Sequence, residues 1–118
     1  MFERVSLKIF YRFGVVDIKV WVKDNELYYS RHTVEGPELD DTDSISSIKA
    51  EEFSQRLEAV KITEWDETYE DITVLDGVTW TVEYLDAGHK KYTSSGCNGY
   101  LETWERFIEL LKEAVGEF

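Results

Sequence analysis

The sequence predicts an α+β domain in which an antiparallel sheet of about five to six strands has two helices packed on one face. Apolar and polar residues alternate in the N-terminal third and again over residues 78–84, which is typical of half-buried strands. Two other stretches, residues 48–60 and 101–115, carry apolar residues at helical spacing. The predicted order of elements is β-β-β-α-β-β-β-α.

The first two strands are predicted from alternation over residues 3–13 and 15–23, interrupted at Gly14. Their apolar positions are Val5, Leu7, Ile9, Tyr11 and Phe13, then Val16, Ile18, Val20 and Val22. Asp24-Asn25 is typical of a second turn, and the Tyr-rich run 26–34 favours a third strand. We therefore expect a three-stranded meander.

Residues 35–47 gather acids, turn formers and the only proline, which predicts a surface loop. From residue 48 the spacing becomes helical, with Ser47 as the expected N-cap. The apolar face of this helix is formed by Phe53, Leu57 and Val60. Residues 61–65 are predicted to continue as a strand.

Residues 72–84 are expected to form two strands joined at Asp76-Gly77, a dipeptide typical of hairpins. A turn at residues 86–88 then leads into another strand, and one pairing to consider is that in which Leu85 faces His89. This pairing places Tyr92 on the same side of the sheet as Val82 and Trp80.

The C-terminal stretch 101–115 is predicted to be an amphipathic helix. Its apolar stripe is Leu101, Trp104, Phe107, Ile108, Leu111 and Val115, and Glu102, Glu105, Glu109 and Glu113 lie opposite. Glutamates four residues apart repel by about 0.2 to 0.5 kcal/mol per pair, and a basic partner would remove this repulsion. The alternative interpretation is an ordinary solvated helix face.

The length and net charge of the chain indicate the number of domains and disfavour some classes of ligand. The 118 residues suffice for one domain, residues 1–118, and 25 acids against 13 bases give a formal charge of −12. This charge disfavours direct binding of nucleic acid and of an anionic membrane, because both require clustered Lys and Arg. We expect a cytoplasmic protein, because the chain has no signal-peptide pattern or long apolar run and only one cysteine, Cys97.

Residues 64–71 stand out because carboxylates and two aromatics occur there without a basic residue. Rings anchor protein interfaces and surrounding charges steer the partner, so this segment suits contact with a basic protein. The alternative is that Trp65, and also Tyr69, pack into the core while the acids decorate a loop. The predicted partner-binding residues are Glu64, Trp65, Asp66, Glu67, Tyr69, Glu70 and Asp71, with Glu105 and Glu109 of the final helix.

No pattern predicts a cofactor, metal or catalytic site. The acidic run 40–43 resembles part of a calcium-binding loop but lacks its glycine and its distant bidentate glutamate. Cys97, His32 and His89 are residue types that serve as nucleophile and base, but no motif of a catalytic family surrounds Cys97. The sequence therefore favours a protein that is not an enzyme.

Residues 48–115 resemble a pattern in small, uncharacterised bacterial and phage-borne acidic proteins. A Trp-bearing hairpin in that pattern runs through a G-x-N-x-Y turn into a final amphipathic helix. The matching residues are Trp65, Tyr69, Asp76-Gly77, Trp80-Thr81-Val82, Ser95 to Tyr100 and Trp104 to Phe107, whereas Leu101 replaces the proline that often follows the tyrosine. The resemblance implies the fold of the second half and a bacterial or phage origin, but no activity.

Two functions follow as hypotheses. The first is a non-enzymatic acidic protein that docks on a basic partner, such as a nuclease, a toxin or another nucleic-acid-acting protein. It would act as an immunity-type or phage-encoded inhibitor by mimicking nucleic acid. The second is a structural or housekeeping module that forms a homodimer through exposed aromatic strands, with Trp21, Tyr28 and Tyr29 at an edge.

Overall fold

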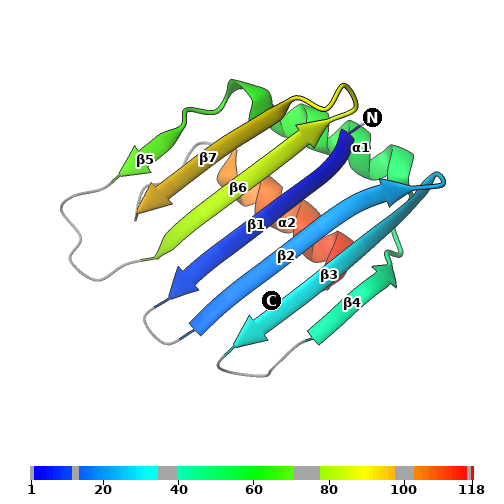
Figure 1. The fold of residues 1–118 in the computed structure, drawn as a ribbon, viewed down its shortest axis with the longest axis horizontal. Coiled ribbons are helices and arrows are strands. Elements are labelled where there is room, and N and C mark those ends of the chain that lie inside the picture. The colour runs from blue at the N-terminus through cyan, green and yellow to red at the C-terminus, as the bar shows by residue number, and fades with distance from the viewer. Residues whose placement is uncertain (1, 12–13, 35–39, 71–77, 98–102, 117) are drawn as a thin grey trace.

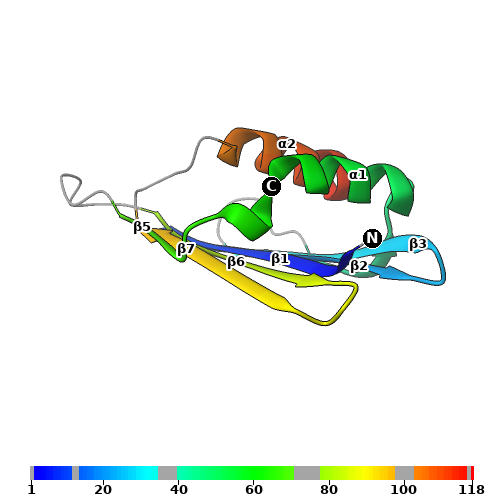
Figure 2. The ribbon, with the colours of Figure 1, turned by 90° about the horizontal axis from the view of Figure 1, so that it is seen from above.

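Two helices cover one face of a seven-stranded sheet in the computed structural model of this chain (Figure 1, Figure 2). The structure describes residues 2–11, 14–34, 40–70, 78–97, 103–116 and 118. The strands are β1 (Phe2–Tyr11), β2 (Gly14–Lys23), β3 (Glu26–Val34), β4 (Asp40–Ile45), β5 (Thr68–Glu70), β6 (Thr79–Asp86) and β7 (Lys91–Cys97). The helices are α1 (Ala50–Val60) and α2 (Trp104–Val115). The predicted α+β class is confirmed.

Strand order in the sheet is β4-β3-β2-β1-β6-β7-β5. All neighbouring strands are antiparallel except β5, which runs parallel to β7. The N-terminal strand β1 therefore lies at the centre, paired with β2 on one edge and with β6 on the other. Figure 1 looks onto the face of the sheet that the helices leave uncovered, which we call the open face.

The N-terminal meander is confirmed with its predicted turn at Asp24-Asn25, whereas residues 12–13, between β1 and β2, lie outside the described residues. β1 and β2 pair through to Tyr11 opposite Gly14. The two residues between β2 and β3, Asp24 and Asn25, have φ angles of 52° and 64°. Positive φ at both central residues is the geometry that suits the twist of a two-residue hairpin.

The predicted surface loop over residues 35–47 is wrong for its second half, because residues 40–45 form β4. This strand pairs with the outer edge of β3, with Tyr28 opposite Ile45 and Tyr29 opposite Ser44. The register then shifts, and Asp43 has a φ of 50°. Pairing with an open strand edge overrides the weak β propensity of acidic and turn-forming residues.

Helix α1 begins at Ala50, and its N-cap is Lys49 without a side-chain hydrogen bond, so Ser47 is not the cap. The neighbouring Ser46 is the bonded serine instead. Its Oγ donates to Ala114 O at 2.7 Å and accepts the Ile48 N–H at 3.2 Å. This serine thereby ties the start of α1 to the end of α2.

The predicted strand over residues 61–65 is also wrong. Lys61 ends α1 in the left-handed conformation, with φ 58°, and residues Ile62–Glu64 form a single 3-10 turn. The Lys61 N–H donates to Glu58 O, which closes the helix end. The turn places Ile62 in the core, where it is only 5% exposed.

The core lies between the helices and β1, β2 and β6, which supply the predicted alternating residues. Its largest fully buried side chains are Trp80, Phe53, Phe107, Leu7, Ile18, Leu27, Leu57, Leu110, Leu111, Val5, Val20 and Val82. Tyr84 is opposite Tyr92, which confirms the predicted side for Tyr92, although Leu85 pairs with Lys91 and not with His89. Burial, with help from Glu58 and Asp86, raises the pKa of Tyr84.

The final helix begins at Trp104, three residues later than predicted, and residues 98–102 lie outside the described residues. The hairpin expected at Asp76-Gly77 also lies outside them. Within the described ranges, neither helix is long and apolar enough to cross a membrane.

Candidate binding surfaces

The acidic segment, residues 64–71, runs from the 3-10 turn into β5 at one edge of the sheet (Figure 1). Its backbone is fixed by β7. Glu67 O accepts the Ser95 N–H at 2.9 Å, and Asp66 O accepts the Ser94 hydroxyl at 2.6 Å. The carboxylates of this segment are therefore presented from an ordered edge.

Trp65 is partly buried and braces the helix layer against the sheet. Its Nε1–H donates to Val60 O at 3.3 Å and to Thr103 Oγ1 at 3.1 Å, which connects the end of α1 to the start of α2. Its ring meets Phe107 and Trp80 edge to face, with centroid distances of 5.4 and 6.4 Å. These contacts give Trp65 a structural role.

Tyr69 also turns toward the core. Its ring stacks on Trp80 with the centroids 5.9 Å apart, and its hydroxyl oxygen accepts the Asp66 N–H at 2.9 Å. Trp80 therefore contacts both aromatic residues of the acidic segment. The structure thus places the rings inward, where the sequence hypothesis required them as surface anchors.

The carboxylates of Glu64, Asp66 and Glu67 are exposed, so rings and charges separate to opposite sides of the segment. Lys61 lies 4.0 Å from Glu64, at the near end of this cluster. Asp71 and the side chain of Glu70 lie outside the described residues. Glu64, Asp66 and Glu67 are therefore the predicted acidic contacts of this segment whose exposed side chains the structure describes.

Glu105 and Glu109 are exposed on α2. Glu105 belongs to the first turn of this helix, and the N-cap residue Thr103 accepts a hydrogen bond from Trp65. Glu109 lines a shallow groove between the helices that also includes Arg56 and Arg106. Arg56 reaches across from α1 to form an ion pair with Glu113. The sequence suggested a nearly pure carboxylate face, but α1 partly neutralises it.

The catalytic residue types are not brought together. His89 Nδ1 lies 2.7 Å from a Glu3 carboxylate oxygen at the β6–β7 turn, whereas Cys97 is at the opposite end of β7. His32 is on β3, four strands from β7, which corresponds to about 19 Å at normal strand spacing. Among the described residues, no group of three or more metal-ligating side chains gathers.

The open face of the sheet is a second candidate surface, which sequence reasoning missed. Cross-strand partners point to the same side, so the registers align Arg4 with Trp21 and Tyr28, and Ser6 with Lys19 and Ser30. These rows lie opposite the buried positions of the same strands. The sequence did contain an indication of this surface, because the polar positions in the alternating patterns of β1 and β2 include several cations.

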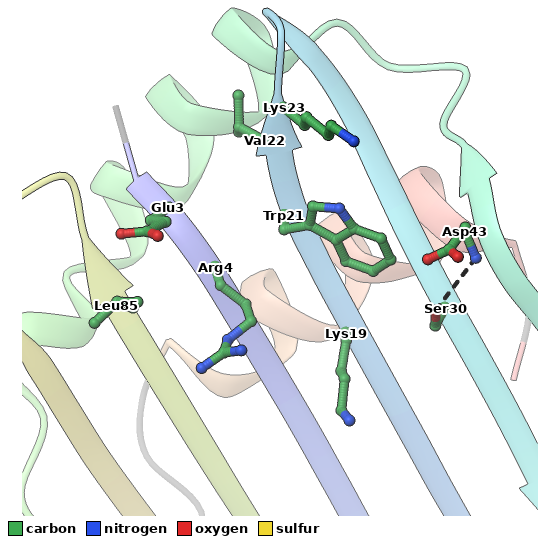
Figure 3. A pocket seen from close by; sticks show the side chains of 9 residues that line it. All are labelled: Glu3, Arg4, Lys19, Trp21, Val22, Lys23, Ser30, Asp43 and Leu85. Carbon is green, nitrogen blue, oxygen red and sulfur yellow. Dashed lines mark hydrogen bonds between the residues drawn. The ribbon is translucent and has the colours of Figure 1, made fainter. Parts of the chain in front are cut away.

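A hollow of about 510 Å³ lies on this face, over β1, β2 and β3 (Figure 3). Its lining residues are Glu3, Arg4, Lys19, Trp21, Val22, Lys23, Ser30, Asp43 and Leu85. The rings of Trp21 and Tyr28 stack at 6.2 Å with an interplanar angle of 15°. Tyr29 packs with the core on the other face, so the predicted trio of Trp21, Tyr28 and Tyr29 does not form one edge surface.

Comparison of the chain with protein-family models, with curated proteins and with solved structures gave no match.

Proposed function

We propose that this protein is a non-enzymatic binding protein that docks on a basic protein through the carboxylates of the acidic segment. The observation that carries the proposal is the separation of charge from packing in this segment. Trp65 and Tyr69 fix the backbone from the core side, and Glu64, Asp66 and Glu67 project into solvent. A charged surface on a rigid support loses little conformational entropy when it binds.

The charge distribution supports this proposal. Glu105 lies in the first turn of α2, whose N-cap residue Thr103 accepts the Trp65 indole N–H, and Glu109 follows one turn later. Spaced carboxylates on a fixed edge match a surface that normally holds phosphates, such as the nucleic-acid groove of a nuclease or toxin. We therefore infer that this protein is an inhibitor of the immunity or phage type, which mimics nucleic acid.

The test compares association rates with a panel of purified basic nucleases. We expect association to slow at least about tenfold between roughly 50 and 500 mM salt, because steering charges are screened. The triple variant Glu64→Gln/Asp66→Asn/Glu67→Gln should slow it by a similar factor at low salt. Stopped-flow fluorescence measures both effects.

A matched control is the triple variant Glu26→Gln/Glu51→Gln/Glu52→Gln, which removes the same charge from exposed positions at the starts of β3 and α1. It should leave the low-salt rate within about twofold, because the partner approaches the other end of the helix layer. If both variants slow association equally, the effect comes from net charge alone. If neither slows it, the acidic segment is not part of the interface.

A second candidate function, self-association, is favoured by apolar exposure on the open face. Phe10 is opposite Val15 and Val15 is opposite Val34, so these residues form an apolar row across β1, β2 and β3. Phe10 is 44% exposed and Val34 is 43% exposed. Light scattering distinguishes the candidates: a dimer that Phe10→Ser dissociates supports self-association, and a monomer at high concentration rules it out.

A further inference from the structure

The hollow in Figure 3 contains three cations, Arg4, Lys19 and Lys23, that have no ion-pair partner among the described residues. On the same open face, Lys8 lies 3.8 Å from Asp17 and Lys91 lies 3.2 Å from Glu83. Within the described part of the chain, Arg4, Lys19 and Lys23 form no ion pair. In a chain with 25 acids and 13 bases, three cations without carboxylate partners give this part of the open face a local positive charge.

The two acids of the hollow lie at its margins. Glu3 is held by His89, whose Nδ1 is 2.7 Å from the carboxylate. Asp43 lies on the far side, where its backbone N–H donates to Ser30 Oγ at 3.4 Å. Ser30, a small side chain, lines the hollow between Lys19 and Asp43 (Figure 3).

Trp21 supplies a flat apolar surface within this cationic ring. Figure 3 shows its ring between Lys23 and Lys19 along β2, with Arg4 alongside on β1. The ring is partly buried and stacked on Tyr28, so its orientation is set before any ligand arrives. Leu85 adds apolar surface on the far side of Arg4, opposite Trp21 in the register.

We propose that this hollow binds a mononucleotide, a ligand that joins a flat base to a phosphate group. The base would stack on Trp21, and the phosphate would lie against Arg4 and Lys19. Arg presents a planar fork that matches phosphate oxygens, Lys adds a point charge, and aromatic side chains stack on bases of any type. A volume of about 510 Å³ falls in the range of small-molecule sites.

A free mononucleotide fits better than single-stranded nucleic acid. A polynucleotide would bring many phosphates close to a molecule with a formal charge of −12, whereas the other described lysines of this face, Lys8 and Lys91, are already paired with carboxylates. Repulsion between the remaining phosphates and the acidic residues would oppose its binding. This inference is independent of the proposed function, because the hollow lies over β1, β2 and β3, whereas the acidic segment lies at the β5 edge of the sheet.

Titration with adenosine monophosphate, followed by two-dimensional NMR and by calorimetry, tests the proposal. The Trp21 indole and backbone signals of residues 19–23 should shift and saturate, while the indole signal of buried Trp80 should not move. Trp21→Ala should weaken binding about tenfold, because the stacking contact is lost. Lys19→Gln should weaken it as well and leave the fold unchanged.

Lys8→Gln is the matched control, since Lys8 is on the same face but is paired with Asp17 and does not line this hollow. Its affinity for adenosine monophosphate should equal that of the wild type. If adenosine binds as tightly as adenosine monophosphate, the cations do not contribute to binding. If inorganic phosphate binds as tightly, Trp21 does not contribute. If a short oligodeoxyadenylate binds more tightly than adenosine monophosphate, the ligand is not a mononucleotide. If the chemical shifts do not saturate, the hollow is not a specific binding site.

Discussion

Replacing Trp80 with alanine should lower the free energy of unfolding by about 3 to 5 kcal/mol, because a fully buried aromatic side chain leaves both lost contacts and a cavity. Trp80 is 0% exposed and contacts Trp65, Tyr69 and Trp104. Domains of this kind are stable by only about 5 to 15 kcal/mol, so the substitution should remove a large fraction of the total stability and lower the urea midpoint strongly. Urea unfolding followed by circular dichroism measures the change.

Trp21→Ala is the control for this substitution, because it removes the same side chain from the open face, where no helix covers it. We expect it to cost less than about 1.5 kcal/mol, mainly through lost stacking on Tyr28. If both variants unfold at the same urea concentration, Trp80 is not the centre of the core.

Replacing Trp65 with alanine should lower the free energy of unfolding by about 2 to 4 kcal/mol, which separates a structural from an interfacial tryptophan. The substitution removes ring contacts with Trp80 and Phe107 and the shared indole hydrogen bond to Val60 O and Thr103 Oγ1. A residue that only anchors a partner would leave the urea midpoint of the isolated protein unchanged.

Trp65→Phe refines the interpretation, since it keeps a ring but removes the indole N–H. We expect it to cost about 1 to 2 kcal/mol, because Val60 O keeps a bond from Thr103 Oγ1 at 3.2 Å. A loss as large as that of Trp65→Ala would assign the stability to hydrogen bonding, and no loss would assign it to packing alone.

Local patterns predicted the elements whose partners are neighbours in the sequence. Alternation and turn residues gave β1, β2 and β3, and helical spacing gave α1 and most of α2. Local patterns failed at β4, whose acidic sequence becomes a strand only because β3 offers an open edge. They also failed at residues 62–64, where burial of Ile62 favours a 3-10 turn over an extended chain.

The site shows the same division. Composition located the acidic segment, but the direction of its rings depends on Trp80 and Phe107, which are distant in the sequence. The hollow required knowledge of register, because Arg4 and Trp21 belong to different strands and become neighbours only through pairing. The cations there were visible in the sequence, but their lack of carboxylate partners within the described structure was not.

The central position of β1 has a consequence for how the chain is made. Of the seven described strands, β1 is synthesised first and can pair with β2 at once, but its other edge stays unpaired until residues 79–86 emerge as β6. Throughout that interval the nascent chain presents an unsatisfied row of amides and carbonyls beside Val5, Leu7 and Ile9. Synthesis that stalls before β6 should therefore yield an aggregation-prone intermediate. Pairing of β6 with β1 is the step by which the C-terminal half protects the N-terminal half from aggregation.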